Sequence, residues 1–61
     1  MNPVKLLTCN ELATLLKISK VGVYRLVGKS LIPFTKVMRS LRFDMSDILA
    51  YLEKNRVKSV G

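Results

Sequence analysis

Residues 8–27 read TCNELATLLKISKVGVYRLV, and this stretch decides the fold. Its apolar side chains recur at the spacing of a helix face, and they form two short runs rather than one. The first run opens at Thr8, a helix N-cap residue with Glu11 three positions later, which is the signature of a capping box. After a break at residues 17–18, Ser19 supplies a second N-cap. We therefore predict two short helices joined by a tight turn.

The two predicted helices would bury their apolar stripes against each other. In the first helix the stripe consists of Cys9, Leu12, Ala13 and Leu16. In the second it consists of Val23, Leu26 and Val27. The opposite face of the second helix carries Lys20, Val21, Tyr24 and Arg25. Helices joined this closely must cross steeply, which is the geometry of a helix-turn-helix whose second helix enters the DNA major groove.

Cations are concentrated downstream of the first predicted helix. The 61 residues include 11 Lys and Arg against 4 Asp and Glu, a formal net charge of +7. No acid lies between Glu11 and Asp44, whereas this interval contains Lys17, Lys20, Arg25, Lys29, Lys36, Arg39 and Arg42. A structural surface normally mixes both signs of charge, so the interval indicates contact with a polyanion. The alternative is that a small basic protein simply carries a solvated charged face.

The composition argues against several other classes of protein. The chain has one cysteine, Cys9, and no histidine, so we expect no zinc cluster, no internal disulfide and no cofactor. No nucleophile has a base beside it, and we expect no enzymatic activity. No apolar run approaches membrane-spanning length and no secretory signal is recognisable, so we expect a cytoplasmic protein with no membrane partner.

The residues after the second helix predict a β-hairpin. We expect Gly28 to follow the last helical turn in a left-handed conformation. Pro33 favours an extended chain before it. Strand-favouring residues then predict that residues 34–37 pair with residues 41–43, with residues 38–40 at the tip. Such a hairpin is marginal alone and must pack on the helices.

A third helix would close the core. Asp44 is its predicted N-cap, and its apolar stripe would consist of Met45, Ile48, Leu49 and Leu52. Residues 1–6 are predicted to be a short leader and residues 57–61 a frayed tail. The whole chain, residues 1–61, is thus predicted to be a single domain with its core in residues 6–55. Its fold class is mainly α with a small β-hairpin, a winged helix-turn-helix.

The order of these motifs resembles the excisionase-type helix-turn-helix family, the small winged domains related to the MerR superfamily that occur in phage excisionases and prophage regulators. The resemblance covers about residues 6–55 and rests on LLTCNELATLLKIS, VYRLV, IPF and LRFDMSDILAYL. The chain departs from the family pattern at Lys17, where a turn glycine is common. Met38 and Arg39 replace the usual glycines of the wing tip, and Leu41 replaces a large aromatic residue. The resemblance implies double-stranded DNA binding, with the second helix in a major groove and the wing on a neighbouring minor groove or backbone.

Ten residues are predicted to contact DNA: Ser19, Lys20, Val21, Gly22, Tyr24, Arg25, Lys29, Lys36, Arg39 and Arg42. Arg25 is the first candidate for a bidentate contact with guanine, and a phosphate contact or a solvated arginine is its alternative. Lys20 suits a phosphate better than a base because lysine is a less directional donor. Arg39 is the best minor-groove candidate. Tyr24 contacts DNA or partly fills the core.

Together these features predict a sequence-specific DNA-binding protein of a mobile element, bacterial or phage-encoded. It would be either an excisionase-like architectural factor or a small transcriptional regulator. An integrase or RNA polymerase would be its protein partner, and monomers would gather on adjacent DNA sites. The alternative is a protein–protein interaction module that uses the apolar third helix, with the basic charge incidental. Salt distinguishes the two, because phosphate contacts weaken steeply as salt rises.

Overall fold

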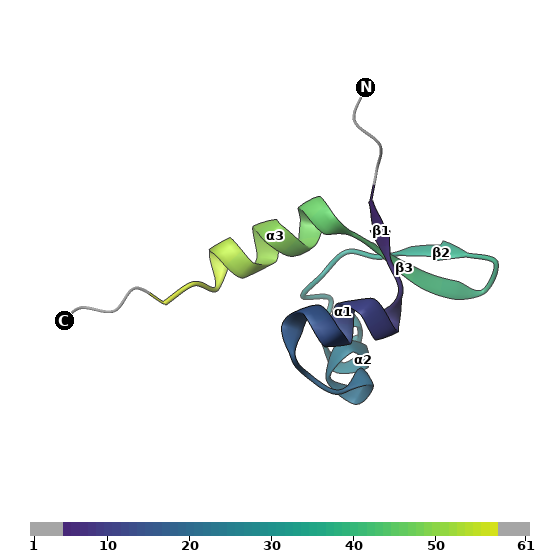
Figure 1. Cartoon of the computed structure of the whole chain (residues 1–61), viewed down its shortest axis with the longest axis horizontal. Helices are drawn as coiled ribbons and strands as arrows, with labels where there is room; N and C mark the ends of the chain where they lie inside the picture. Colours follow the sequence, from purple (N-terminus) through teal and green to yellow (C-terminus); the bar gives the residue numbers. More distant parts are fainter. Residues whose placement is uncertain (1–4, 58–61) are drawn as a thin grey trace, which may run out of the picture.

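The computed structural model describes residues 5–57, which fold into helices and a small sheet (Figure 1). In chain order the elements are β1 (Leu6–Leu7), α1 (Cys9–Leu16), α2 (Lys20–Gly28), β2 (Thr35–Val37), β3 (Ser40–Asp44) and α3 (Met45–Lys54). The arrangement is mainly helical with a hairpin wing, which confirms the predicted winged helix-turn-helix. Most of the predicted leader and tail, residues 1–4 and 58–61, lies outside the described residues.

The first two helices begin where the sequence places their caps. The Thr8 hydroxyl accepts a hydrogen bond from the Glu11 backbone N–H at 3.1 Å, and the Glu11 carboxylate accepts one from the Thr8 backbone N–H at 2.9 Å. The predicted capping box is therefore confirmed. The Ser19 hydroxyl accepts a hydrogen bond from the Gly22 N–H at 3.2 Å and starts α2 in the same way. Each cap contributes about 1 kcal/mol to stability.

Helix α1 ends in a left-handed residue that is not glycine. Lys17 has a φ of 57° and a ψ of 43°. The next N–H, of Ile18, donates to the Ala13 carbonyl at 3.0 Å, which closes the helix end in a Schellman motif. A residue with a Cβ in this conformation costs about 1–2 kcal/mol. The turn of the helix-turn-helix therefore lowers the stability of the domain.

Helix α2 ends in the same motif, but not at the predicted residue. Gly28 is the last helical residue and its φ is not positive, whereas Ser30 has a φ of 55°. The Leu31 N–H donates to the Leu26 carbonyl at 3.0 Å. The prediction of a left-handed Gly28 is therefore wrong. The chain turns after Lys29 and then places Ile32, which is 3% exposed, in the core.

One small core lies between α1, α2, the sheet and the start of α3. Its buried residues are Leu7, Leu12, Ala13, Val23, Ile32, Phe43 and Ile48. Six of them come from the elements other than β2, and Ile32 comes from the segment between α2 and β2. The three residues of β2 are all exposed, so the strands of the wing reach the core through β3.

The sheet has three antiparallel strands in the order β1-β3-β2, not the two that the sequence predicts. The strand that is not predicted is β1, in which Leu6 pairs with Asp44 and Leu7 pairs with Phe43. The prediction that the leader extends as far as Leu6 is wrong. Two residues show too little alternation to reveal a strand, and their partners are distant in the sequence.

The tip of the wing is a two-residue turn. Val37 pairs with Ser40, so only Met38 and Arg39 form the tip, and the predicted three-residue tip and a strand start at Phe34 are wrong. Met38 has a φ of 47° and Arg39 a φ of 69°. Two successive positive φ values define a type I′ turn, whose twist matches that of the strands and which normally selects Asn-Gly. The twist of the hairpin explains the short tip. Neither Met38 nor Arg39 is suited to this turn, because a residue with a Cβ disfavours a positive φ.

Helix α3 packs on the core through its first turns and then leads away from the body (Figure 1). Asp44 caps it by accepting a hydrogen bond from the Ser46 N–H at 2.9 Å, as predicted. Ile48 is fully buried, but Leu49 is 57% and Leu52 is 41% exposed. The prediction that these two leucines close the core is wrong, because both stay exposed and neither packs against the core cluster. None of the helices within residues 5–57 is long and apolar enough to cross a membrane.

Candidate nucleic-acid interface

The outer face of α2 is held toward solvent by the burial of its inner face. Val23 is fully buried, and the two other residues of the inner stripe are half-buried. The opposite face exposes Lys20, Val21, Tyr24 and Arg25. The predicted division of α2 into an apolar stripe and an exposed, partly cationic face is therefore confirmed. A face of this kind on a helix can enter the major groove, which is wide enough for an α-helix.

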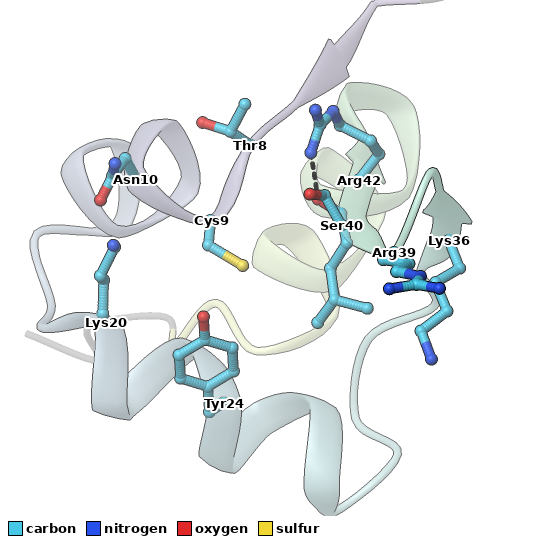
Figure 2. Close-up of a pocket in the computed structure, with 10 residues that line it drawn as sticks. Thr8, Cys9, Asn10, Lys20, Tyr24, Lys36, Arg39, Ser40 and Arg42 are labelled. Atoms are coloured by element: carbon cyan, nitrogen blue, oxygen red, sulfur yellow. Dashed lines mark hydrogen bonds between the residues drawn. The ribbon is translucent and has the colours of Figure 1, made fainter.

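A hollow of about 500 Å³ lies between α2, the start of α1 and the wing (Figure 2). Four of its lining residues are cations, Lys20 from α2 and Lys36, Arg39 and Arg42 from the wing. No Asp or Glu lines it. We call this surface the basic hollow. Two elements that are separate in the sequence thus direct positive charge into one concave surface.

The cations of the basic hollow have no acidic partner in the described part of the chain. Within residues 5–57, the one side-chain ion pair joins Arg56 to Glu53 at 3.8 Å, at the end of α3. Arg42 is half-buried, and its Nη1 donates to the Leu41 carbonyl at 2.9 Å, which holds its guanidinium in place. Unpaired cations in a concave surface raise the local concentration of anions. The hollow is therefore suited to phosphate groups.

The first residues of α1 complete the basic hollow. Thr8, Cys9 and Asn10 line it, so the positive end of the α1 dipole opens into it. None of these three residues is among the ten predicted to contact DNA. The capping box reveals where α1 begins, but only the pairing of β1 with β3 brings that helix start beside the wing.

Tyr24 and Cys9 meet inside the basic hollow, where the tyrosine hydroxyl points toward the thiol (Figure 2). The neighbouring thiol raises the pKa of Tyr24 above its ordinary value of 10.0. The phenol is protonated at neutral pH and can donate a hydrogen bond. Cys9 is half-buried and packs against the core, as its predicted role of a small apolar residue requires.

Five of the predicted contact residues lie outside the basic hollow: Ser19, Val21, Gly22, Arg25 and Lys29. Arg25 lies on the flank of α2 nearer to α3, where it lines an apolar groove with Tyr51 and Leu52. A Cβ at Gly22 would lie 3.1 Å from the Ile18 side chain. A side chain at this position would therefore require the exposed Ile18 side chain to shift by a few tenths of an ångström.

Comparisons with known proteins agree with this geometry. The family model of the helix-turn-helix domain matches residues 6–56. The chain belongs to this family, in its excisionase-type form, and it is a DNA-binding helix-turn-helix protein. It is similar to the uncharacterized protein YvgK of Bacillus subtilis (strain 168), with 39% identity over 57 residues. That match covers 93% of this chain but 18% of YvgK. No solved structure gives a significant match.

Proposed function

We propose that this protein binds a specific double-stranded DNA sequence with α2 in the major groove and the wing on the adjacent backbone or minor groove. The observation that carries the proposal is the basic hollow, in which four cations from α2 and the wing, none of them paired with an acid of residues 5–57, face one concave surface. A phosphate backbone seated in this hollow would have a major groove on the α2 side and a minor groove on the wing side.

The exposed residues then divide into two roles. Those of the hollow, Lys20, Tyr24, Lys36, Arg39 and Arg42, would hold phosphates and fix the register of the protein on DNA. Arg25, on the adjacent flank of α2, would read a base, and guanine is the best match for its guanidinium. Ser19, Val21, Gly22 and Lys29 would line the edges of the contact.

The biological role that fits this mode of DNA binding is that of a DNA-binding factor of a mobile element, either excisionase-like or a small transcriptional regulator. The protein would act in the cytoplasm of a bacterium without catalysis, and would recruit an integrase or RNA polymerase to the DNA that it marks. Several monomers would occupy adjacent sites.

The test is fluorescence anisotropy with a labelled mixed-sequence duplex, followed by selection of preferred sites from a random duplex pool. Lys20→Ala and Arg39→Ala should weaken binding to all sequences and reduce the slope of log K against log salt by about 1 each. Arg25→Ala should cost about 1–3 kcal/mol on the selected sequence and relax the preference at one position.

Lys54→Ala is the matched control, because Lys54 is an exposed lysine at the end of α3, outside the basic hollow. It removes the same charge and should leave the salt slope unchanged. Equal effects of Lys54→Ala and Lys20→Ala would show that net charge alone drives binding. Absence of binding at low salt would refute the proposal and leave the exposed apolar face of α3, with Leu49 and Leu52, as the surface to investigate.

A further inference from the structure

The wing ends in an exposed apolar side chain. Met38 is 94% exposed, the highest value among the large hydrophobic residues of the described chain. It is the first residue of the type I′ turn, and its φ is 47°. Asparagine or glycine would occupy this position with less strain, and a polar residue would be better solvated. Both the strain and the exposure are unfavourable in the free protein, and a bound state that buries Met38 would remove the exposure.

The surroundings of Met38 suggest what would cover it. Lys36, Arg39 and Arg42 of the wing line the basic hollow, and Met38 stands beside Arg39 in the turn at the tip. None of the β2 residues contributes to the core, so the hairpin can enter a groove without disturbing the fold. Proteins that bind the minor groove often insert an apolar side chain such as methionine between base steps, while nearby cations contact the groove.

We propose that Met38 is a wedge that enters the minor groove and partly unstacks one base step, so that the wing kinks the DNA it binds. The proposal rests on the function proposed above, and it adds a mechanism for deforming the duplex. Methionine suits this role because its unbranched thioether chain is thin and adapts to an irregular gap. The cations behind it would hold the phosphates on either side of the opened step. Pyrimidine–purine steps such as TA should be preferred, because they unstack most easily.

The experiment compares two duplexes that differ only at the centre. One has a paired TA step, and the other has a tandem mismatch at the same place, where unstacking is already partly complete. The wild type should bind the mismatched duplex roughly tenfold more tightly, because the protein no longer supplies the unstacking energy. Met38→Leu keeps an apolar tip and should keep this preference.

Met38→Asn is the decisive variant. Asparagine favours the type I′ turn, so the thermal midpoint should rise, and the charge is unchanged. The variant should bind both duplexes with affinities within about twofold of each other, since no wedge has to be inserted. A 2-aminopurine base beside the central step should brighten when the wild type binds the paired duplex and stay quenched with Met38→Asn. Arg39→Ala serves as the control, because it should weaken binding to both duplexes equally.

The outcomes separate this proposal from the one on which it rests. If wild type and Met38→Asn bind the paired duplex but show the same ratio between the two duplexes, DNA binding stands and the wedge is refuted. If 2-aminopurine brightens equally with both proteins, the wedge is refuted as well. If no variant binds either duplex at low salt, both proposals fail. Met38→Gly also suits the turn and repeats the test should Met38→Asn fail to fold.

Discussion

The left-handed residue at the end of α1 gives the sharpest prediction of stability. Lys17 has a φ of 57°, and this conformation costs a residue with a Cβ about 1–2 kcal/mol. Lys17→Gly removes that cost, but it also gives the unfolded chain more conformational freedom, which lowers the free energy of unfolding by about 0.5–1 kcal/mol. The net gain should be about 0.5–1 kcal/mol, and in a domain of this size it should raise the thermal midpoint by roughly 2–8 °C.

Lys29→Gly is the matched control. Lys29 also stands at a helix end and carries the same charge, but its φ is −91° and its ψ is 6°, which any residue adopts. Glycine there adds only unfolded-state freedom, so the midpoint should fall by a few degrees, on the order of 0.5–1 kcal/mol. Thermal unfolding followed by circular dichroism measures both variants. Equal shifts in the two variants, or a lower midpoint for Lys17→Gly, would refute the reasoning.

Three further predictions concern the core, the helix caps and α2. Phe43→Ala should lower the free energy of unfolding by about 3–5 kcal/mol, because Phe43 is fully buried, and this approaches the whole stability of so small a domain. The dispersion of NMR signals that marks the folded protein should therefore be lost. The pKa values of Glu11 and Asp44 lie below their ordinary 4.5 and 3.8, because Glu11 accepts a backbone hydrogen bond and Asp44 a hydroxyl hydrogen bond at a helix start. The stability they add is therefore fully present above those ordinary values and is lost as the pH falls through the lowered ones, so the thermal midpoint should decline in acid, and less so in Glu11→Gln. Gly28→Ala should raise the free energy of unfolding in urea by about 1 kcal/mol, because the backbone there is helical and nothing lies within 4 Å of the added Cβ. A lower free energy of unfolding would contradict a helical backbone at this residue.

The parts of the fold that the sequence predicts well are those set by neighbouring residues. The caps at Thr8, Ser19 and Asp44 are confirmed, because a cap needs only a side chain and a backbone group two or three positions away. The exposed face of α2 follows from helical spacing in the same way. The exposed face of α2 is therefore predictable from residues 19–29 alone.

The parts that the sequence does not predict depend on distant residues. Nothing near Leu6 indicates that it pairs with Asp44, and this pairing decides that the start of α1 lines the basic hollow. The apolar spacing of Leu49 and Leu52 is as regular as that of Ile48, but a spacing pattern does not show whether another element exists to cover it. The two-residue wing tip follows from strand twist, which Met38 and Arg39 do not signal.

The central position of β3 has a consequence for the order in which the molecule forms. Its residues pair with β1 on one side and β2 on the other, and its last residue caps α3. During synthesis, Leu6 and Leu7 therefore have no strand partner until Phe43 and Asp44 have been made. The helix-turn-helix can form its local turns early, but the sheet that orients it is completed only by the second half of the chain. We expect the geometry between α2 and the wing to appear in one late, cooperative step.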